Sequence, residues 1–176
     1  MRFDTKQLSR CAILTALALA LSYMENMVPV VQLVLPLPGV KLGLANVVTL
    51  FALCTLGAPS ALCVLIARCI LSSLFAGNAS ALIYSLLGGL CAMGVMIVLA
   101  HIRQLSVFGV SIGGAAAHNC GQVAAAVLVL GNGAPLVYLP FLLIVSVFTG
   151  ALTGFIAQLL FRAVSHIPLQ GGNANG

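Results

Sequence analysis

Charged side chains are scarce in this 176-residue chain, and acids are the scarcest of them. Asp, Glu, Lys and Arg make up only 5% of the residues, against about 25% in a soluble domain, and the two acids are Asp4 and Glu25. So little polar surface cannot cover a globule in water, and 62% of the residues are hydrophobic. The composition therefore predicts a membrane protein, and the shortage of carboxylates excludes most acid–base and magnesium chemistry.

Motifs for catalysis and metal binding are also missing. The chain has no phosphate loop, no Gly-x-Ser-x-Gly elbow, no His-Glu-x-x-His and no carboxylate pair. Its six cysteines lie in apolar runs without a Cys-x-x-Cys pair, so we interpret them as reduced packing residues. The net charge of +5 comes from single cations scattered along an apolar chain, which is not the pattern of a nucleic-acid-binding patch. We expect no enzymatic activity, no cofactor, no metal site and no nucleic-acid partner.

Apolar runs separated by Gly, Pro and Asn predict an all-α membrane protein, with six transmembrane helices in one domain at residues 1–164. The expected spans are Leu8–Met27, Lys41–Leu56, Pro59–Phe75, Ala81–Ala100, Val107–Leu130 and Pro135–Val164. The first span follows a basic stretch, as in a signal peptide, but no cleavage site follows it, so we expect it to be retained. Residues 165–176 are polar and glycine-rich, and we expect them to be disordered.

The connection Pro29–Val40 contains three prolines and one glycine in twelve residues, which prevents a regular helix. Because unsatisfied backbone cannot face lipid, we expect an apolar loop lying on, or dipping into, the protein at the membrane surface.

Basic residues indicate how the chain is oriented in the membrane. Arg2, Lys6 and Arg10 precede the first span, Arg103 lies between the fourth and fifth, and Arg162 closes the sixth. Under the positive-inside rule both termini then lie in the cytoplasm, with the protein in the cell membrane. This orientation leaves the cation of Lys41 on the outer side, at the start of the second span.

Polar residues within the spans are the candidates for function, because an ionisable group at the centre of a membrane helix costs at least about 2.5 kcal/mol. On the expected topology they gather in the outer half and at the midplane. The candidate ligand-binding residues are Glu25, Asn26, Lys41, Asn46, Arg68, Asn78, Tyr84, His118, Asn119 and Gln122. The two cations Lys41 and Arg68 and the one acid Glu25 leave one net positive charge, which a bound anion would balance. The pattern predicts an outward-facing cavity for a small ligand.

Each polar group also has a structural interpretation, and the sequence leaves both open. Lys41 can extend its amine to the lipid headgroups, and Arg68 can serve as the ion-pair partner of Glu25. His118 can be a hydrogen-bonded core residue, while Asn119 and Gln122 can cross-link helices.

Two stripes of small residues recur at helical spacing. Ala12, Ala16 and Ala20 lie four residues apart in the first span, and Gly109, Gly113, Ala117 and Gly121 do so in the fifth. Such stripes let helices approach closely in lipid. We interpret the glycine stripe as internal packing, whereas the alanine stripe is open to either internal packing or docking of a partner.

The segment PGVKLGLANVVTL, Pro38–Leu50, resembles the signature of the Gx transporter family, also named heptaprenyl diphosphate synthase component I. That family is similar to the substrate-binding S components of energy-coupling factor transporters. The resemblance implies a six-helix bundle with cytoplasmic termini and an outer ligand cavity capped by the Pro29–Val40 loop. It also implies that Ala12, Ala16 and Ala20 dock on a transmembrane coupling subunit that works with two ATPase subunits. On this reading the chain is the binding subunit of an ATP-driven uptake transporter for a small anionic or amphipathic nutrient.

The second name of the family implies a different role, as an accessory component of a polyprenyl diphosphate synthase. Such enzymes hold the allylic diphosphate through magnesium on aspartate-rich motifs, and the one aspartate here is Asp4, so the chain would not be the catalytic one. A structural subunit of a membrane redox assembly is the third alternative.

Overall fold

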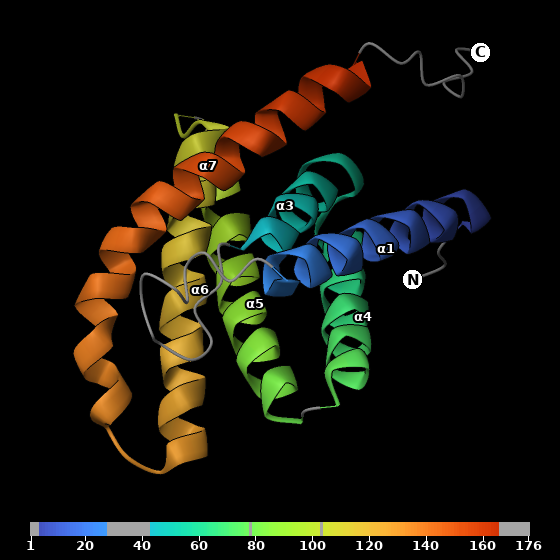
Figure 1. The fold of residues 1–176 in the computed structure, drawn as a ribbon. Helices are drawn as coiled ribbons and strands as arrows, with labels where there is room; N and C mark the ends of the chain where they lie inside the picture. The colour runs from blue at the N-terminus through green and yellow to red at the C-terminus, as the bar shows by residue number, and fades with distance from the viewer. Residues whose placement is uncertain (1–3, 28–42, 78, 103, 166–176) are drawn as a thin grey trace, which may run out of the picture.

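The structure is a computed structural model that describes residues 4–27, 43–77, 79–102 and 104–165. This part of the chain is helical and contains no strand (Figure 1). Its elements are α1 (Thr5–Met27), α3 (Leu44–Leu56), α4 (Ala58–Ala76), α5 (Ala79–Ala100), α6 (Val107–Leu130), the 3₁₀ helix η1 (Ala134–Tyr138) and α7 (Leu139–Ser165). The predicted all-α membrane fold is confirmed. The expected Pro29–Val40 loop lies outside the described residues, as does all of the expected tail except Ser165.

Five of these helices are long and apolar enough to cross a membrane, and α3 is the shorter sixth. Its 13 residues extend about 20 Å at 1.5 Å per residue, less than the roughly 30 Å of a hydrocarbon core. The glycines at its two ends explain the length, since Gly43 has φ 79° and Gly57 has φ 83°, a backbone conformation that breaks a helix and favours glycine. The second predicted span therefore begins at Leu44 rather than Lys41.

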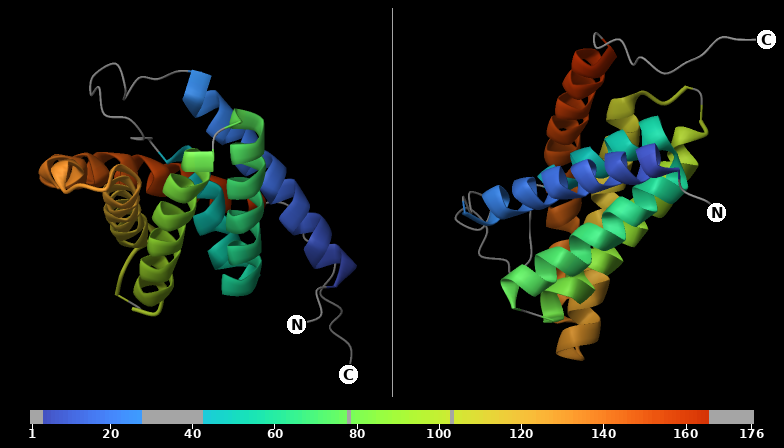
Figure 2. Two further views of the ribbon diagram at one scale, coloured as in Figure 1. Left: turned by 90° about the horizontal axis from the view of Figure 1, so that it is seen from below. Right: turned by 90° about the vertical axis from the view of Figure 1, so that its right-hand side faces the viewer.

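The helices form two groups that meet at α3. Helices α5, α6 and α7 pack in sequence order, and α1, α3 and α4 contact one another. In Figure 1, α1 lies across α3 and α4, while α7 follows α6 and then leans over toward α3. Figure 2 shows the same crossing of α1 over α4 from two other directions. Helix α3 also contacts α5 and α7, so its side chains lie at the centre of the bundle.

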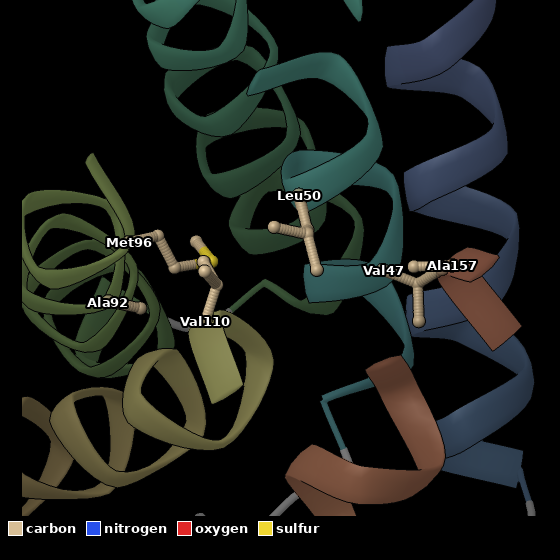
Figure 3. Packing of buried hydrophobic residues seen from close by; sticks show 6 residues of the cluster. All are labelled: Val47, Leu50, Ala92, Met96, Val110 and Ala157. Carbon is tan, nitrogen blue, oxygen red and sulfur yellow. The ribbon is translucent and has the colours of Figure 1, made fainter. Parts of the chain in front are cut away.

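The main apolar core surrounds α3 (Figure 3). Its buried members come from four helices and are Val47, Leu50, Ala92, Met96, Val110 and Ala157. Large apolar side chains such as Phe75, Val137 and Phe148 are instead strongly exposed on the outside of the bundle. This distribution suits a protein whose outer surface faces lipid.

The glycine stripe packs inside the bundle, as the sequence analysis expects. A Cβ atom on Gly121 would lie 2.7 Å from the carbonyl oxygen of Leu87 and 2.8 Å from Cα of Gly88, both on α5. A Cβ on Gly113 would clash with the Leu99 side chain on α5. Because these glycines have no side chain, the backbones of α5 and α6 approach closely, which is how helices associate in lipid.

Replacing Gly121 by alanine should therefore destabilise the α5–α6 pair. The new methyl group would meet backbone atoms of α5, so the helices must separate, and we expect a loss of about 1–3 kcal/mol. The measurement is the midpoint of thermal unfolding of the detergent-solubilised protein, followed by helical circular dichroism. Gly94→Ala on α5 is the control, because a Cβ there meets nothing within 4 Å. Equal midpoints for the two variants would contradict the prediction.

Candidate ligand-binding site

A small polar cavity lies between α1, α3, α4, α5 and α6. The residues that line it are Ser22, Glu25, Gly43, Ala45, Asn46, Arg68, Cys69, Ser72, Ser85, His118 and Gln122. Its volume is about 20 Å³, which is room for about one water molecule. Five of the predicted ligand-binding residues, Glu25, Asn46, Arg68, His118 and Gln122, thus come together from four separate helices.

Arg68 on α4 is the buried cation of this cavity, with 7% of its surface exposed. Its Nη2 donates a hydrogen bond of 3.0 Å to Oδ1 of Asn46 at the start of α3. Its Nε is also buried and has no hydrogen-bond partner within the part of the chain that the structure describes. A buried guanidinium with a donor to spare is suited to bind an oxygen acceptor.

Glu25, near the end of α1, faces the same cavity. Its Oε1 accepts a hydrogen bond of 2.7 Å from the backbone N–H of Gly43, the N-cap residue of α3. A carboxylate there is favoured by the positive end of the α3 dipole. The charges of Glu25 and Arg68 also attract each other. Glu25 therefore links α1 to the start of α3. It also attracts the charge of Arg68, as the structural interpretation of Arg68 expects.

Helix α6 supplies His118 and Gln122, both buried and one turn apart. Asn119 is also buried, but its Nδ2 donates a 2.9 Å hydrogen bond to the carbonyl oxygen of Leu142 on α7. The three polar residues expected on one side of α6 thus face two different parts of the bundle. His118 and Gln122 line the cavity, while Asn119 cross-links α6 to α7.

The remaining predicted residues are placed as follows. Tyr84 on α5 is partly buried and is not among the residues that line the cavity, whereas the adjacent Ser85 is. Asn26 belongs to α1, but its side chain lies outside what the structure describes, as do Lys41 and Asn78.

Sequence reasoning missed the small polar residues of the cavity. Ser22 lies three residues before Glu25, and Ser72 lies four residues after Arg68. Both spacings place a residue on the same helix face as a predicted site residue, so a search at helical spacing around each charge would have found them.

Asn46 also lines a second cavity, of about 10 Å³, which shares Gly43 with the first. There the hydroxyl groups of Ser111 on α6 and Thr153 on α7 form a buried hydrogen bond of 2.8 Å. Asn46 thus lines both cavities, and its hydrogen bond with Arg68 fixes its orientation.

The chemistry available in this cavity is hydrogen bonding and single charges. In the described ranges no group of three or more His, Cys, Asp and Glu side chains is placed to hold a metal ion. All six cysteines lie in described helices, and no disulfide joins them. The arrangement can therefore bind and orient a polar group.

The alanine stripe lies on the outer face of α1. Ala12, Ala16 and Ala20 are exposed. The residues of α1 that are buried lie on its other face and are Cys11, Thr15, Ala18 and Ser22. Within the described bundle the stripe is exposed rather than buried, so it is accessible to a partner or to lipid.

Residues 14–160 match the family described as heptaprenyl diphosphate synthase component I. The chain belongs to this family. The match confirms the family expected from the Pro38–Leu50 segment, and it includes every residue that lines the polar cavity. No curated protein and no solved structure matches the chain. The polar cavity is thus part of a membrane protein of the heptaprenyl diphosphate synthase component I family.

Proposed function

We propose that the protein is the ligand-binding membrane subunit of an ATP-driven uptake transporter, and that it captures a small anionic or amphipathic molecule from outside the cell. The observation that carries the proposal is the polar cavity around the buried Arg68. Ionisable groups inside a membrane are costly, and they mark ligand and ion sites. Polar side chains from five helices converge on this cation within an otherwise apolar bundle.

The chain cannot hydrolyse ATP alone, because the sequence has no phosphate loop and no carboxylate pair, so active uptake would draw on partner subunits or on an ion gradient. We propose a transmembrane coupling subunit and two ATPase subunits, with the chain itself non-catalytic. The exposed face of Ala12, Ala16 and Ala20 supports this, since a flat stripe of small residues lets a partner helix approach closely in lipid.

The name of the family favours a second candidate, an accessory membrane component of heptaprenyl diphosphate synthase. Purification of the tagged chain from its native membrane in mild detergent separates the two. Recovery of two ATPases and a membrane coupling subunit supports the transporter, whereas recovery of a soluble prenyl synthase supports the accessory role. Mass spectrometry of small molecules extracted from the same preparation identifies the ligand.

The proposed orientation predicts the labelling of cysteine probes in a variant without the six native cysteines. A membrane-impermeant thiol reagent should label Asn132→Cys, in the exposed Gly131–Ala134 turn, on intact cells. It should label His101→Cys, beside Arg103, only after the cells are permeabilised. The physical reason is that the cations at the termini and at Arg103 stay on the cytoplasmic side. Labelling of His101→Cys on intact cells would contradict the model with both termini inside.

A further inference from the structure

Helix α3 begins inside the bundle rather than at its edge. Gly43 and Ala45 at its start line the polar cavity, and Ala45 and Val47 are buried. The first N–H groups of a helix have no partner within that helix, and together they carry partial positive charge. The N–H of the N-cap residue Gly43 already donates to Oε1 of Glu25, so a ligand group at this helix start would bind beside that carboxylate. In membrane proteins such interior helix starts commonly face anionic groups of a ligand.

Arg68 provides a second, independent indication that an anionic group binds at the start of α3. Its side chain is buried and lines the cavity together with Gly43 and Ala45. Its Nη2 is held by Asn46, but its Nε–H has no acceptor among the described residues. A buried guanidinium donor beside a helix start is a site for an oxyanion.

The charge of the cavity restricts which oxyanion fits. Among the described lining residues the charged groups are one cation, Arg68, and one carboxylate, Glu25. A diphosphate would add two or three negative charges facing Glu25, and proteins hold such groups with several cations or with magnesium. The described ranges offer no group of three or more His, Cys, Asp and Glu side chains for a metal ion. Glu25 already offsets the charge of Arg68, so each negative charge on a ligand lacks a further cation among the described lining residues, and a group with a single negative charge meets the least repulsion.

We propose that one oxygen of a ligand carboxylate, rather than of a phosphate or diphosphate, enters the cavity between Arg68 and the first turn of α3. The volume of this cavity, about 20 Å³, admits a single water-sized atom. This assignment rests on the proposed binding function and specifies its ligand class. A carboxylate ligand would also differ in chemical class from the diphosphate in the name of the family.

The test compares four sodium salts on the purified full chain, namely formate, acetate, phosphate and pyrophosphate, at ionic strength matched with chloride. Formate and acetate at about ten times their dissociation constants should raise the midpoint of thermal unfolding by about 3–6 °C. Phosphate and pyrophosphate should leave it at the chloride value. Isothermal titration calorimetry measures the same preferences as affinities.

Asn46→Asp is the deciding variant. It keeps the oxygen that accepts the Arg68 hydrogen bond and adds a carboxylate beside it, so it should weaken formate and acetate binding at least 10-fold without loss of folding. Asn132→Asp adds the same charge in an exposed turn, where Oδ1 accepts from the N–H of Ala134, and should bind as the wild type does.

The possible failures are distinguishable. Stabilisation by phosphate or pyrophosphate in place of the carboxylates would overturn the carboxylate assignment. It would not contradict the proposal that the chain is a ligand-binding subunit. An unchanged carboxylate response in Asn46→Asp would overturn the position of the site. No response to any of the four salts would overturn the anion site itself, while the recovery of partner subunits tests the transporter role separately.

Discussion

Replacing Arg68 by alanine should weaken binding of the ligand recovered with the wild-type protein by roughly 10-fold to 150-fold. A charge-assisted hydrogen bond contributes about 1.5–3 kcal/mol, and that range of free energy corresponds to this range of affinity. The contact is strong because Asn46 holds the guanidinium in place and because Arg68 is buried, where the low local dielectric strengthens a hydrogen bond. Equilibrium binding to the purified variant measures the effect, and Lys41→Ala tests the second predicted cation in the same way.

Glu25→Gln distinguishes a ligand contact from a structural ion pair. Glutamine keeps a carbonyl oxygen that can accept the hydrogen bond from the Gly43 N–H, so the link between α1 and α3 survives and only the negative charge is lost. If Arg68 binds the ligand, the variant should bind an anion more tightly. If Arg68 serves mainly as the partner of Glu25, the variant should instead unfold at a lower temperature. Unchanged affinity in both cation variants would mean that the cavity binds a neutral molecule.

Replacing Ala16 by tryptophan should abolish uptake and leave ligand binding within about 2-fold of the wild type. The side chain would stand on the exposed face of α1 and hold a partner helix away, since small residues allow the close approach that drives association in lipid. The cavity lies on the other side of α1, where Ser22 is buried. Uptake into cells and binding to purified protein are the two measurements.

Ala124→Trp on α6 is the matched control for Ala16→Trp. Ala124 is also exposed, but it lies on a helix that is not packed against α1. It should therefore support normal uptake. If Ala16→Trp assembles with its partners and transports normally, the alanine stripe faces only lipid.

The sequence by itself determined the class of the fold and the limits of most helices. Its shortage of charge leaves no soluble fold open, and in lipid the backbone can satisfy its hydrogen bonds within helices. Gly57 and the polar turns at Gly77 and Gly131 end the apolar runs where the structure ends α3, α4 and α6. The segment Pro38–Leu50 was also sufficient to indicate the family that the chain belongs to.

The tertiary structure decided which polar groups meet. Helical periodicity shows that His118, Asn119 and Gln122 lie near one side of their helix, but not which neighbour each one faces. The packing of α6 between α5 and α7 directs Asn119 to a carbonyl oxygen of α7 and leaves the other two to the cavity. Likewise the left-handed conformation of Gly43 starts α3 beside Arg68 and Glu25. The sequence pattern of a helix determines which of its residues share a face. Which faces then meet in one cavity depends on how the helices pack, here on the crossing of α1 over α3 and α4 and on the close contact of α5 with α6.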